Sequence, residues 1–153
     1  MFRAPQTLFR VLAIAEAVSW TLLITALIVR AASGFAFGVT IAGAIHGFVF
    51  LSYGATAVLL ALHQRWSVWP TVAAIASAII PYATIPTEIW LARSGRLAGA
   101  WRLDEAADPA DRRWYDGPLR WFLRRPWVLA LLILVAVAAL FTVLLLLGPP
   151  GGK

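Results

Sequence analysis

The sequence predicts an all-α membrane protein with four transmembrane helices, in which a three-helix core is followed by a C-terminal helix. Of its 153 residues, 61% are hydrophobic and only 13% are charged, whereas a soluble domain is about 45–50% apolar and about 25% charged. The apolar residues gather in four runs of about 20 residues or more, the length that a helix needs to cross a bilayer. An ordinary soluble protein is therefore excluded, and the absence of cysteine excludes disulfides and Cys-ligated metal sites.

The first predicted span covers residues 8–29 and carries an acid, Glu16, near its middle. An acidic side chain at that depth costs about 2.5–3.5 kcal/mol to insert, so it should be protonated, partnered or facing a polar cavity. Two interpretations stay open: a proton or cation site, and a structural carboxyl that hydrogen-bonds a neighbouring helix. A cleavable signal peptide fits less well, because its apolar core would be only about 7–15 residues long.

The second predicted span covers residues 39–62 and holds His46 between Gly43 and Gly47. This small-xxx-small spacing lets another helix approach closely, and Gly54 lies on the same helix face. We therefore expect the three glycines to form a helix-packing face. His46 either hydrogen-bonds across that contact or takes part in proton relay or in metal or haem ligation. The other histidine, His63, lies about 25 Å further along the helix, so the two cannot ligate one haem within a monomer.

Glu16 and His46 are offset by about 11 Å in depth if the first two spans stand level, as the rise per helical residue shows. This separation is too large for a direct hydrogen bond. Ser19 and Tyr53 are the side chains that could bridge it.

The third predicted span covers residues 68–91 and contains internal prolines. Pro81 and Pro86 each remove one backbone hydrogen bond, so a kink is expected at each of them. Glu88 lies near the end of this span, and an interfacial ion pair with Arg93 is the expected role for it.

The connection over residues 92–126 is polar and carries eight arginines against five acids. Its second half mixes cations with aromatic residues, which is typical of an amphipathic segment lying on an anionic leaflet. The fourth predicted span, residues 127–147, has no charge at all. The residues expected to contact lipid headgroups are Arg112, Arg113, Trp114, Arg120, Trp121, Arg124 and Arg125.

The orientation follows from the positions of Arg and Lys, which are enriched in cytoplasmic loops. With four spans, nine basic residues fall on the side of the connection and four on the other side. We therefore expect residues 92–126 in the cytoplasm of a bacterial inner membrane, with both termini outside. The first span alone indicates the reverse, since Arg3 and Arg10 outweigh Arg30. Because eight of the 13 basic residues lie in this one connection between apolar runs, where they are a topology signal, we expect no nucleic-acid binding.

Six residues of the first three spans form a pattern known from a protein family: Glu16, Ser19, His46, Gly47, Pro81 and Glu88. The pattern resembles that of the short bacterial integral-membrane proteins called YdzA-like, except that Ala83 stands where a glycine is usual. The resemblance covers about residues 8–96 and makes the rest of the chain an added module. That family has no known function, so the resemblance implies a membrane location and no activity.

Two classes of function are consistent with these features. The first is a non-catalytic accessory or assembly subunit of a membrane complex, which a close-packing glycine face favours. The alternative is a small proton- or cation-linked transporter or channel that uses Glu16 and His46, as a homo-oligomer. An enzyme is not expected, because the sequence has no nucleophile elbow, phosphate-binding loop or HExxH motif. We expect no cofactor or metal, and as partners the bilayer, anionic headgroups and another membrane protein or a second copy.

Overall fold

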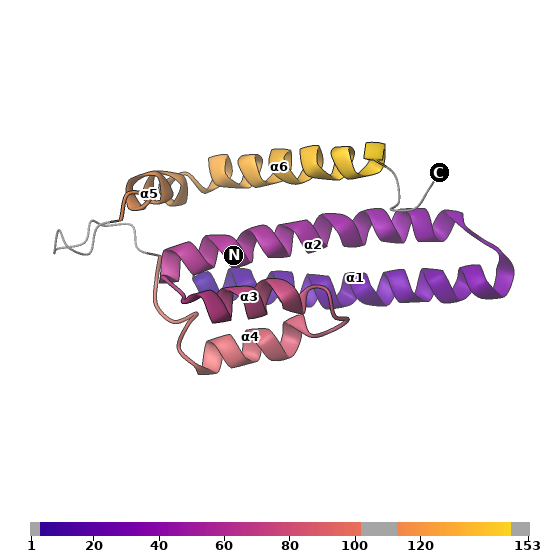
Figure 1. Ribbon diagram of the computed structural model, residues 1–153, viewed down its shortest axis with the longest axis horizontal. Coiled ribbons are helices and arrows are strands. Elements are labelled where there is room, and N and C mark those ends of the chain that lie inside the picture. Colours follow the sequence, from indigo (N-terminus) through magenta and orange to yellow (C-terminus); the bar gives the residue numbers. More distant parts are fainter. Residues whose placement is uncertain (1–3, 102–112, 148–153) are drawn as a thin grey trace.

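The computed structural model describes residues 4–101 and 113–147. Within these two ranges the chain forms six helices and no strand. In chain order they are α1 (Pro5–Ser33), α2 (Phe37–Gln64), α3 (Val68–Ser77), α4 (Thr84–Arg93), α5 (Asp116–Arg124) and α6 (Pro126–Leu147) (Figure 1). The predicted all-α fold is confirmed for these residues. Of the described helices, α1 and α2 are long and apolar enough to span a membrane, so four spans are not established.

The first two helices form a long antiparallel hairpin that contains the first two predicted spans (Figure 1). Pro5 begins α1 at a position where its missing N–H is no loss. Gly34 ends α1 with a φ of 74°, and its N–H donates to the Arg30 carbonyl at 2.8 Å. Only glycine adopts this left-handed conformation at no steric cost, so the chain reverses there.

The predicted third span is wrong as a single helix, because residues 68–91 break into two helices of ten residues each. The break covers residues 78–83, and α4 then returns beside α3 (Figure 1). Pro81 cannot supply a helical hydrogen bond, and the next residue, Tyr82, has a φ of 65° that turns the chain. A ten-residue helix is about 15 Å long, half of the hydrocarbon thickness, so neither α3 nor α4 alone is long enough to cross a bilayer.

Pro86 also differs from its prediction, because it causes no kink. It is the third residue of α4, which begins at Thr84. The first four N–H groups of a helix have no partner within the helix, so a proline there removes no bond.

The α3–α4 hairpin is fixed against the long helices by buried polar contacts. Thr84 donates its hydroxyl to the Ala13 carbonyl of α1 at 3.0 Å. The Tyr53 hydroxyl of α2 lies 3.0 Å from Ser77 Oγ. Because polar groups in a bilayer core have little water available, these contacts hold the hairpin at a defined depth.

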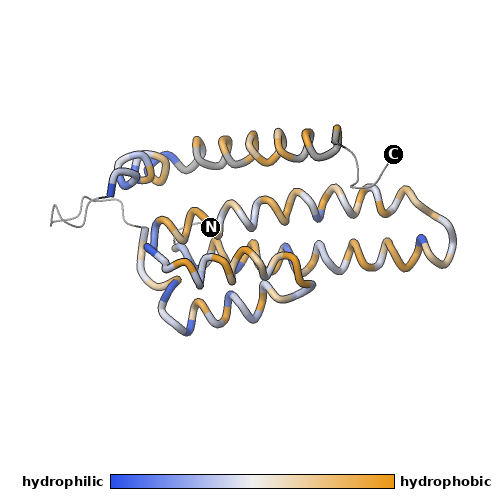
Figure 2. Tube along the Cα trace, viewed as in Figure 1, coloured by the Kyte–Doolittle hydropathy of each residue, from blue (hydrophilic) through white to orange (hydrophobic). Residues whose placement is uncertain are grey.

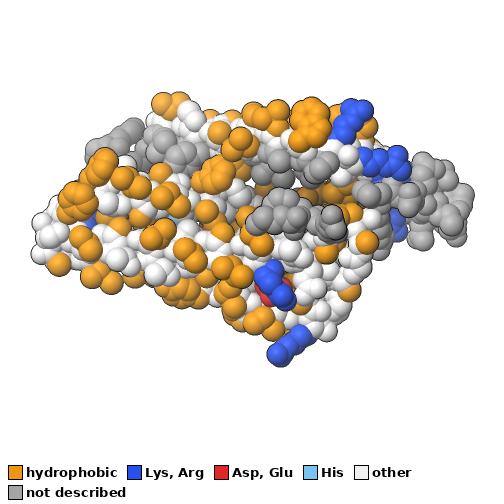
Figure 3. Space-filling model, turned by 180° about the vertical axis from the view of Figure 1, so that it is seen from behind, with side chains coloured by type: hydrophobic (Ala, Val, Ile, Leu, Met, Phe, Trp, Pro, Cys, Tyr) orange, Lys and Arg blue, Asp and Glu red, His pale blue; other side chains and the backbone are white. Residues whose placement is uncertain are grey.

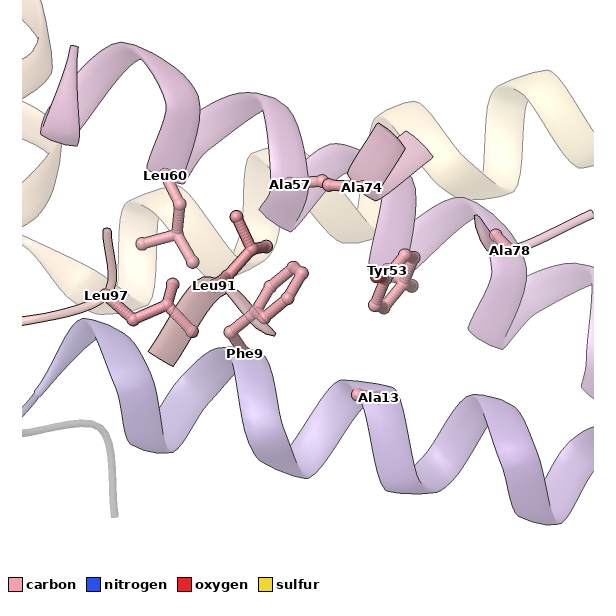
Figure 4. Packing of buried hydrophobic residues seen from close by; sticks show 9 residues of the cluster. All are labelled: Phe9, Ala13, Tyr53, Ala57, Leu60, Ala74, Ala78, Leu91 and Leu97. Atoms are coloured by element: carbon pink, nitrogen blue, oxygen red, sulfur yellow. The ribbon is translucent and has the colours of Figure 1, made fainter. Parts of the chain in front are cut away.

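The apolar core lies where α1, α2, α3 and α4 meet. The Phe9 ring stacks at a tilt on the Tyr53 ring, with 5.1 Å between the centroids. Small residues at the crossings let the backbones approach closely. The cluster of buried side chains consists of Phe9, Ala13, Tyr53, Ala57, Leu60, Ala74, Ala78, Leu91 and Leu97 (Figure 4).

The two ends of the molecule differ in charge, as Figure 3 shows on one face, and Figure 2 shows the hydropathy of the residues along the same chain. The turn between α1 and α2 forms one end, here called the turn end. At the other end, the cationic end, α1 begins, α2 and α4 end, and α5 lies (Figure 1). Of nine described cations, only Arg30 is near the turn end. The eight at the cationic end are Arg10, Arg65, Arg93, Arg96, Arg113, Arg120, Arg124 and Arg125.

This arrangement corrects the predicted separation of the N-terminal side from the connection. The start of α1 and both flanks of the connection lie at the cationic end, because α3 and α4 turn back instead of crossing (Figure 1). The charges around the first span and the total count of basic residues then indicate the same orientation.

Helices α5 and α6 follow the predicted amphipathic segment and the predicted fourth apolar run. Asp116 begins α5 and accepts a hydrogen bond from the Arg113 N–H at 2.8 Å. This acid in the first turn also complements the helix dipole. α6 covers the predicted bounds 127–147 and runs alongside α2 (Figure 1).

Candidate functional site

The polar side chains buried between α1 and α2 form a three-residue chain midway along the hairpin. Ser19 Oγ lies 3.1 Å from Glu16 Oε2 and 2.9 Å from His46 Nδ1. The direct distance from His46 Nδ1 to Glu16 Oε2 is 3.8 Å. Ser19 therefore bridges the carboxyl and the imidazole, which come from different helices.

The predicted depth offset between Glu16 and His46 was wrong. It assumed that the two spans stand level, whereas α1 extends beyond α2 at the turn end (Figure 1). This stagger moves His46 toward Ser19, one helical turn after Glu16. Tyr53, the other bridge considered, hydrogen-bonds Ser77 instead.

The order of the three groups distinguishes this chain from a hydrolytic triad. In a triad the imidazole lies between the carboxylate and the hydroxyl, and activates the hydroxyl for attack. Here the Ser19 hydroxyl lies between the other two groups and is buried. The arrangement can hold or pass a proton, but it presents no nucleophile to a substrate.

Glu16 is fully buried and only partly satisfied. Its Oε2 contacts Ser19, whereas its Oε1 accepts no hydrogen bond from any residue in the described ranges. The Trp20 ring covers one side of the site, with its centroid 4.4 Å from that of His46. A buried carboxyl oxygen without a donor is one that can carry a proton.

The tip of the α3–α4 hairpin lies against the same part of α1. Trp20 Nε1 donates to the Ala78 carbonyl at 3.3 Å. Thr21 Oγ1 lies 3.3 Å from the Tyr82 hydroxyl. Interrupted helices that end near the middle of a membrane recur at the binding sites of transporters.

Glu88 forms an ion pair, but the predicted partner Arg93 was wrong. Its Oε1 lies 3.0 Å from Arg10 Nε of α1. Arg93 is five residues further along α4, and side chains at that spacing do not share a helix face. The sequence held a signal for the true partner, since Arg10 interrupts an apolar run and a cation there needs an acid.

The glycines predicted to pack against another helix lie on an open part of α2. A Cβ atom built on Gly43 or on Gly54 would meet no heavy atom within 4 Å in the described structure. Gly47, between them in sequence, is half-buried. Close helix packing at Gly43 and Gly54 is therefore not made among the described helices.

One comparison with known proteins concerns the first four helices. A protein family described as a domain of unknown function, DUF3817, matches residues 6–93. The chain belongs to the DUF3817 family. The matched residues, here called the DUF3817 core, include α3 and α4 and leave α5 and α6 outside.

A bacterial relative is similar to more than half of this chain. A protein of Streptomyces coelicolor described as a "Putative membrane protein" is 35% identical over 91 residues, or 58% of this chain. Those residues are only 11% of that protein, so this chain spans about a tenth of the length of the curated relative it matches. No solved structure matches the chain significantly.

The residues predicted to contact lipid headgroups follow the DUF3817 core. Arg113, Trp114, Trp121, Arg124 and Arg125 are exposed, and Arg120 is half-buried. Two of them interact, since the Arg125 guanidinium lies 4.7 Å from the centre of the Trp121 ring. Arg112 lies outside the described residues. Headgroup contact stays a prediction.

Proposed function

We propose that this DUF3817 protein is a non-catalytic accessory module that associates with a larger membrane protein. The observation that carries the proposal is the bacterial relative, in which the similar region is 11% of a much longer chain described as a membrane protein. A domain that is covalently joined to a large membrane protein in one chain is a good candidate for non-covalent association in another.

The open glycine positions of α2 support this role. Gly43 lies in the half of the hairpin near the turn end, where neighbouring apolar side chains such as Ile41 and Ile45 are exposed. Small residues let a foreign helix approach closely in a membrane. A partner helix that packs there would use the glycines that the described helices leave open.

The proposed orientation places the cationic end in the cytoplasm of a bacterial inner membrane. Eight of the nine described cations lie at that end, and cytoplasmic segments are enriched in Arg and Lys. The N-terminal side and the connection then share the cytoplasm. Since the chain contains no cysteine, single cysteines introduced at Gln6, Phe35 and Gly99 report sidedness cleanly. An impermeant thiol reagent added outside intact spheroplasts should label only Phe35→Cys. Labelling of Gln6→Cys without labelling of Gly99→Cys would place the N-terminal side and the connection on opposite sides of the membrane, and would refute the proposal that they share one side.

Co-purification tests the accessory role. The native, chromosomally tagged protein is extracted in a mild detergent after cross-linking in the cell. A larger membrane protein present in stoichiometric amount is the expected result, and Gly43→Leu should reduce its recovery. Gly117→Leu, in α5, is the matched control, because an added Cβ there meets no heavy atom within 4 Å. A homo-oligomer without any partner would contradict the proposal.

A second candidate function rests on the polar chain of Glu16, Ser19 and His46. Its buried, partly unsatisfied carboxyl beside an interrupted helix favours a small proton- or cation-linked transporter. Purified protein in liposomes would then carry a proton or cation flux. Glu16→Gln keeps the shape of the side chain but cannot ionise, so flux should vanish while the fold persists. A strain with Glu16→Gln that behaves as wild type wherever a deletion strain fails would remove this candidate.

The resemblance to the YdzA-like proteins is narrower than membership of the DUF3817 family, and its meaning is also a proposal. The six residues that resemble the YdzA-like proteins include the polar chain and Glu88, so they mark the contacts that hold α1, α2 and α4 together. We therefore propose that this pattern is a structural signature of the core.

A further inference from the structure

An apolar groove of about 540 Å³ lies between α2, α3 and α6. Its floor on α2 includes Phe50, Gly54 and Val58, and α6 contributes Leu132 and Val137 to the wall. All described side chains that line it are apolar, and Gly54 leaves its centre open. The groove is therefore shaped for an apolar chain at membrane depth.

A second hollow of about 420 Å³ continues from this groove toward the cationic end. The two share Val58 as a lining residue. Most of its lining on α2 and α3 is apolar, and the polar and charged side chains that join it include Arg65, Arg113 and Tyr115. One face of α2 runs through both hollows, so an apolar channel ends at a cationic mouth.

The dimensions match one half of a bilayer. The apolar part extends on α2 from Phe50 to Leu62, or about 18 Å along the helix axis at 1.5 Å per residue. One leaflet of the hydrocarbon core is about 15 Å thick. A lipid chain lying in the groove would bring its headgroup to the cationic mouth.

Asp116 fixes the residues of the cationic mouth relative to α2. Arg65 pairs with Asp116 at 3.2 Å, and the backbone N–H of Arg113 donates to the same carboxylate at 2.8 Å. These contacts fix the segment that carries Arg113 beside the end of α2. Arg113 is then positioned to receive a phosphate through charge-assisted hydrogen bonds.

We propose that the two hollows form a binding site for one anionic phospholipid. One acyl chain occupies the groove between α2, α3 and α6, and the phosphate binds at Arg113 and Tyr115. Basic pockets between membrane helices on the cytoplasmic side bind anionic headgroups by the same chemistry. A second copy in the same orientation is disfavoured as the occupant, because it would bring two cationic ends together.

The test uses the full-length protein, incubated in mild detergent with an equimolar mixture of phosphatidylglycerol and phosphatidylcholine and analysed by native mass spectrometry. The expected result is one retained phosphatidylglycerol per chain. Gly54→Leu fills the groove without a clash and should abolish retention, and Ala136→Leu fills it from the opposite wall if the first variant fails to fold. Ala44→Leu is the control, since it adds a leucine side chain to an exposed position of α2 outside the groove.

The headgroup contact is tested separately. Arg113→Gln should weaken phosphatidylglycerol binding about fivefold, which is the effect of one cation near an anionic surface, and leave phosphatidylcholine binding unchanged. Arg93→Gln, at the same end on α4, should change neither. Retention of phosphatidylglycerol by both groove-filling variants would overturn the proposal. So would a wild-type dimer that Gly54→Leu dissociates, which would assign the groove to a second copy.

Discussion

Replacing Ser19 by alanine removes the hydroxyl that joins Glu16 to His46 and should destabilise the α1–α2 hairpin. The change deletes contacts of 3.1 Å and 2.9 Å and leaves a buried carboxyl oxygen and an imidazole nitrogen without this partner. A hydrogen bond between membrane helices contributes about 0.6 kcal/mol on average and up to about 1.7 kcal/mol. A buried polar group left unsatisfied costs about 1–3 kcal/mol. We expect the free energy of unfolding to fall by about 1–2 kcal/mol.

Equilibrium unfolding in mixed detergent micelles, followed by far-ultraviolet circular dichroism, measures this loss. Ser52→Ala is the matched control, because Ser52 lies on α2, is half-buried, and donates to the Phe48 carbonyl of its own helix. It should change the unfolding free energy by less than about 0.5 kcal/mol.

A double-mutant cycle with His46→Gln isolates the bond between the helices. The two changes should be non-additive, with a coupling of about 0.5–3 kcal/mol, because both remove the same contact. Equal effects of Ser19→Ala and Ser52→Ala, or strictly additive effects in the cycle, would refute the bridge.

Three further changes test the contacts of the α3–α4 hairpin. Each is followed by the same unfolding measurement. Arg10→Gln leaves the buried Glu88 carboxylate without its ion-pair partner and should lower the free energy of unfolding by about 1 kcal/mol. The double variant Arg10→Gln, Glu88→Gln should recover this loss. A double variant without recovery would argue against the ion pair. Thr84→Val removes the bond to the α1 backbone and should cost about 1 kcal/mol, whereas Thr71→Val, which loses a bond within its own segment, should cost less. Pro86→Ala should change the free energy of unfolding by less than about 1 kcal/mol, because the proline lies in the first turn of α4. A larger change would instead support the kink predicted at Pro86 from the sequence.

The helices themselves were predictable from the sequence, but the path of the third apolar run was not. Long apolar runs identify α1, α2 and α6 because only a helix satisfies the backbone in an apolar surrounding. Pro81 is equally compatible with a kinked span and with a reversal. The reversal depends on Tyr82 in a left-handed conformation and on contacts such as Thr84 to Ala13, which join residues far apart in the chain.

The candidate site was predictable in its members and not in its geometry. Glu16 and His46 stand out because ionisable groups are costly in a membrane. Ser19 is an unremarkable residue by type, and its role depends on the axial stagger of two helices. Such a stagger is set by side-chain packing along the whole hairpin, which no local pattern records.

The α3–α4 hairpin also has a consequence for how the DUF3817 core can be combined with other proteins. The core has two candidate spans, α1 and α2, and two crossings return a chain to the side of the membrane where it began. A unit with an even number of crossings can be joined to a longer membrane protein without inverting the helices that follow. A core with three crossings would reverse every downstream segment. The turn at residues 78–83 keeps the third apolar run from forming one long helix, and so favours a core that leaves the orientation of its neighbours unchanged.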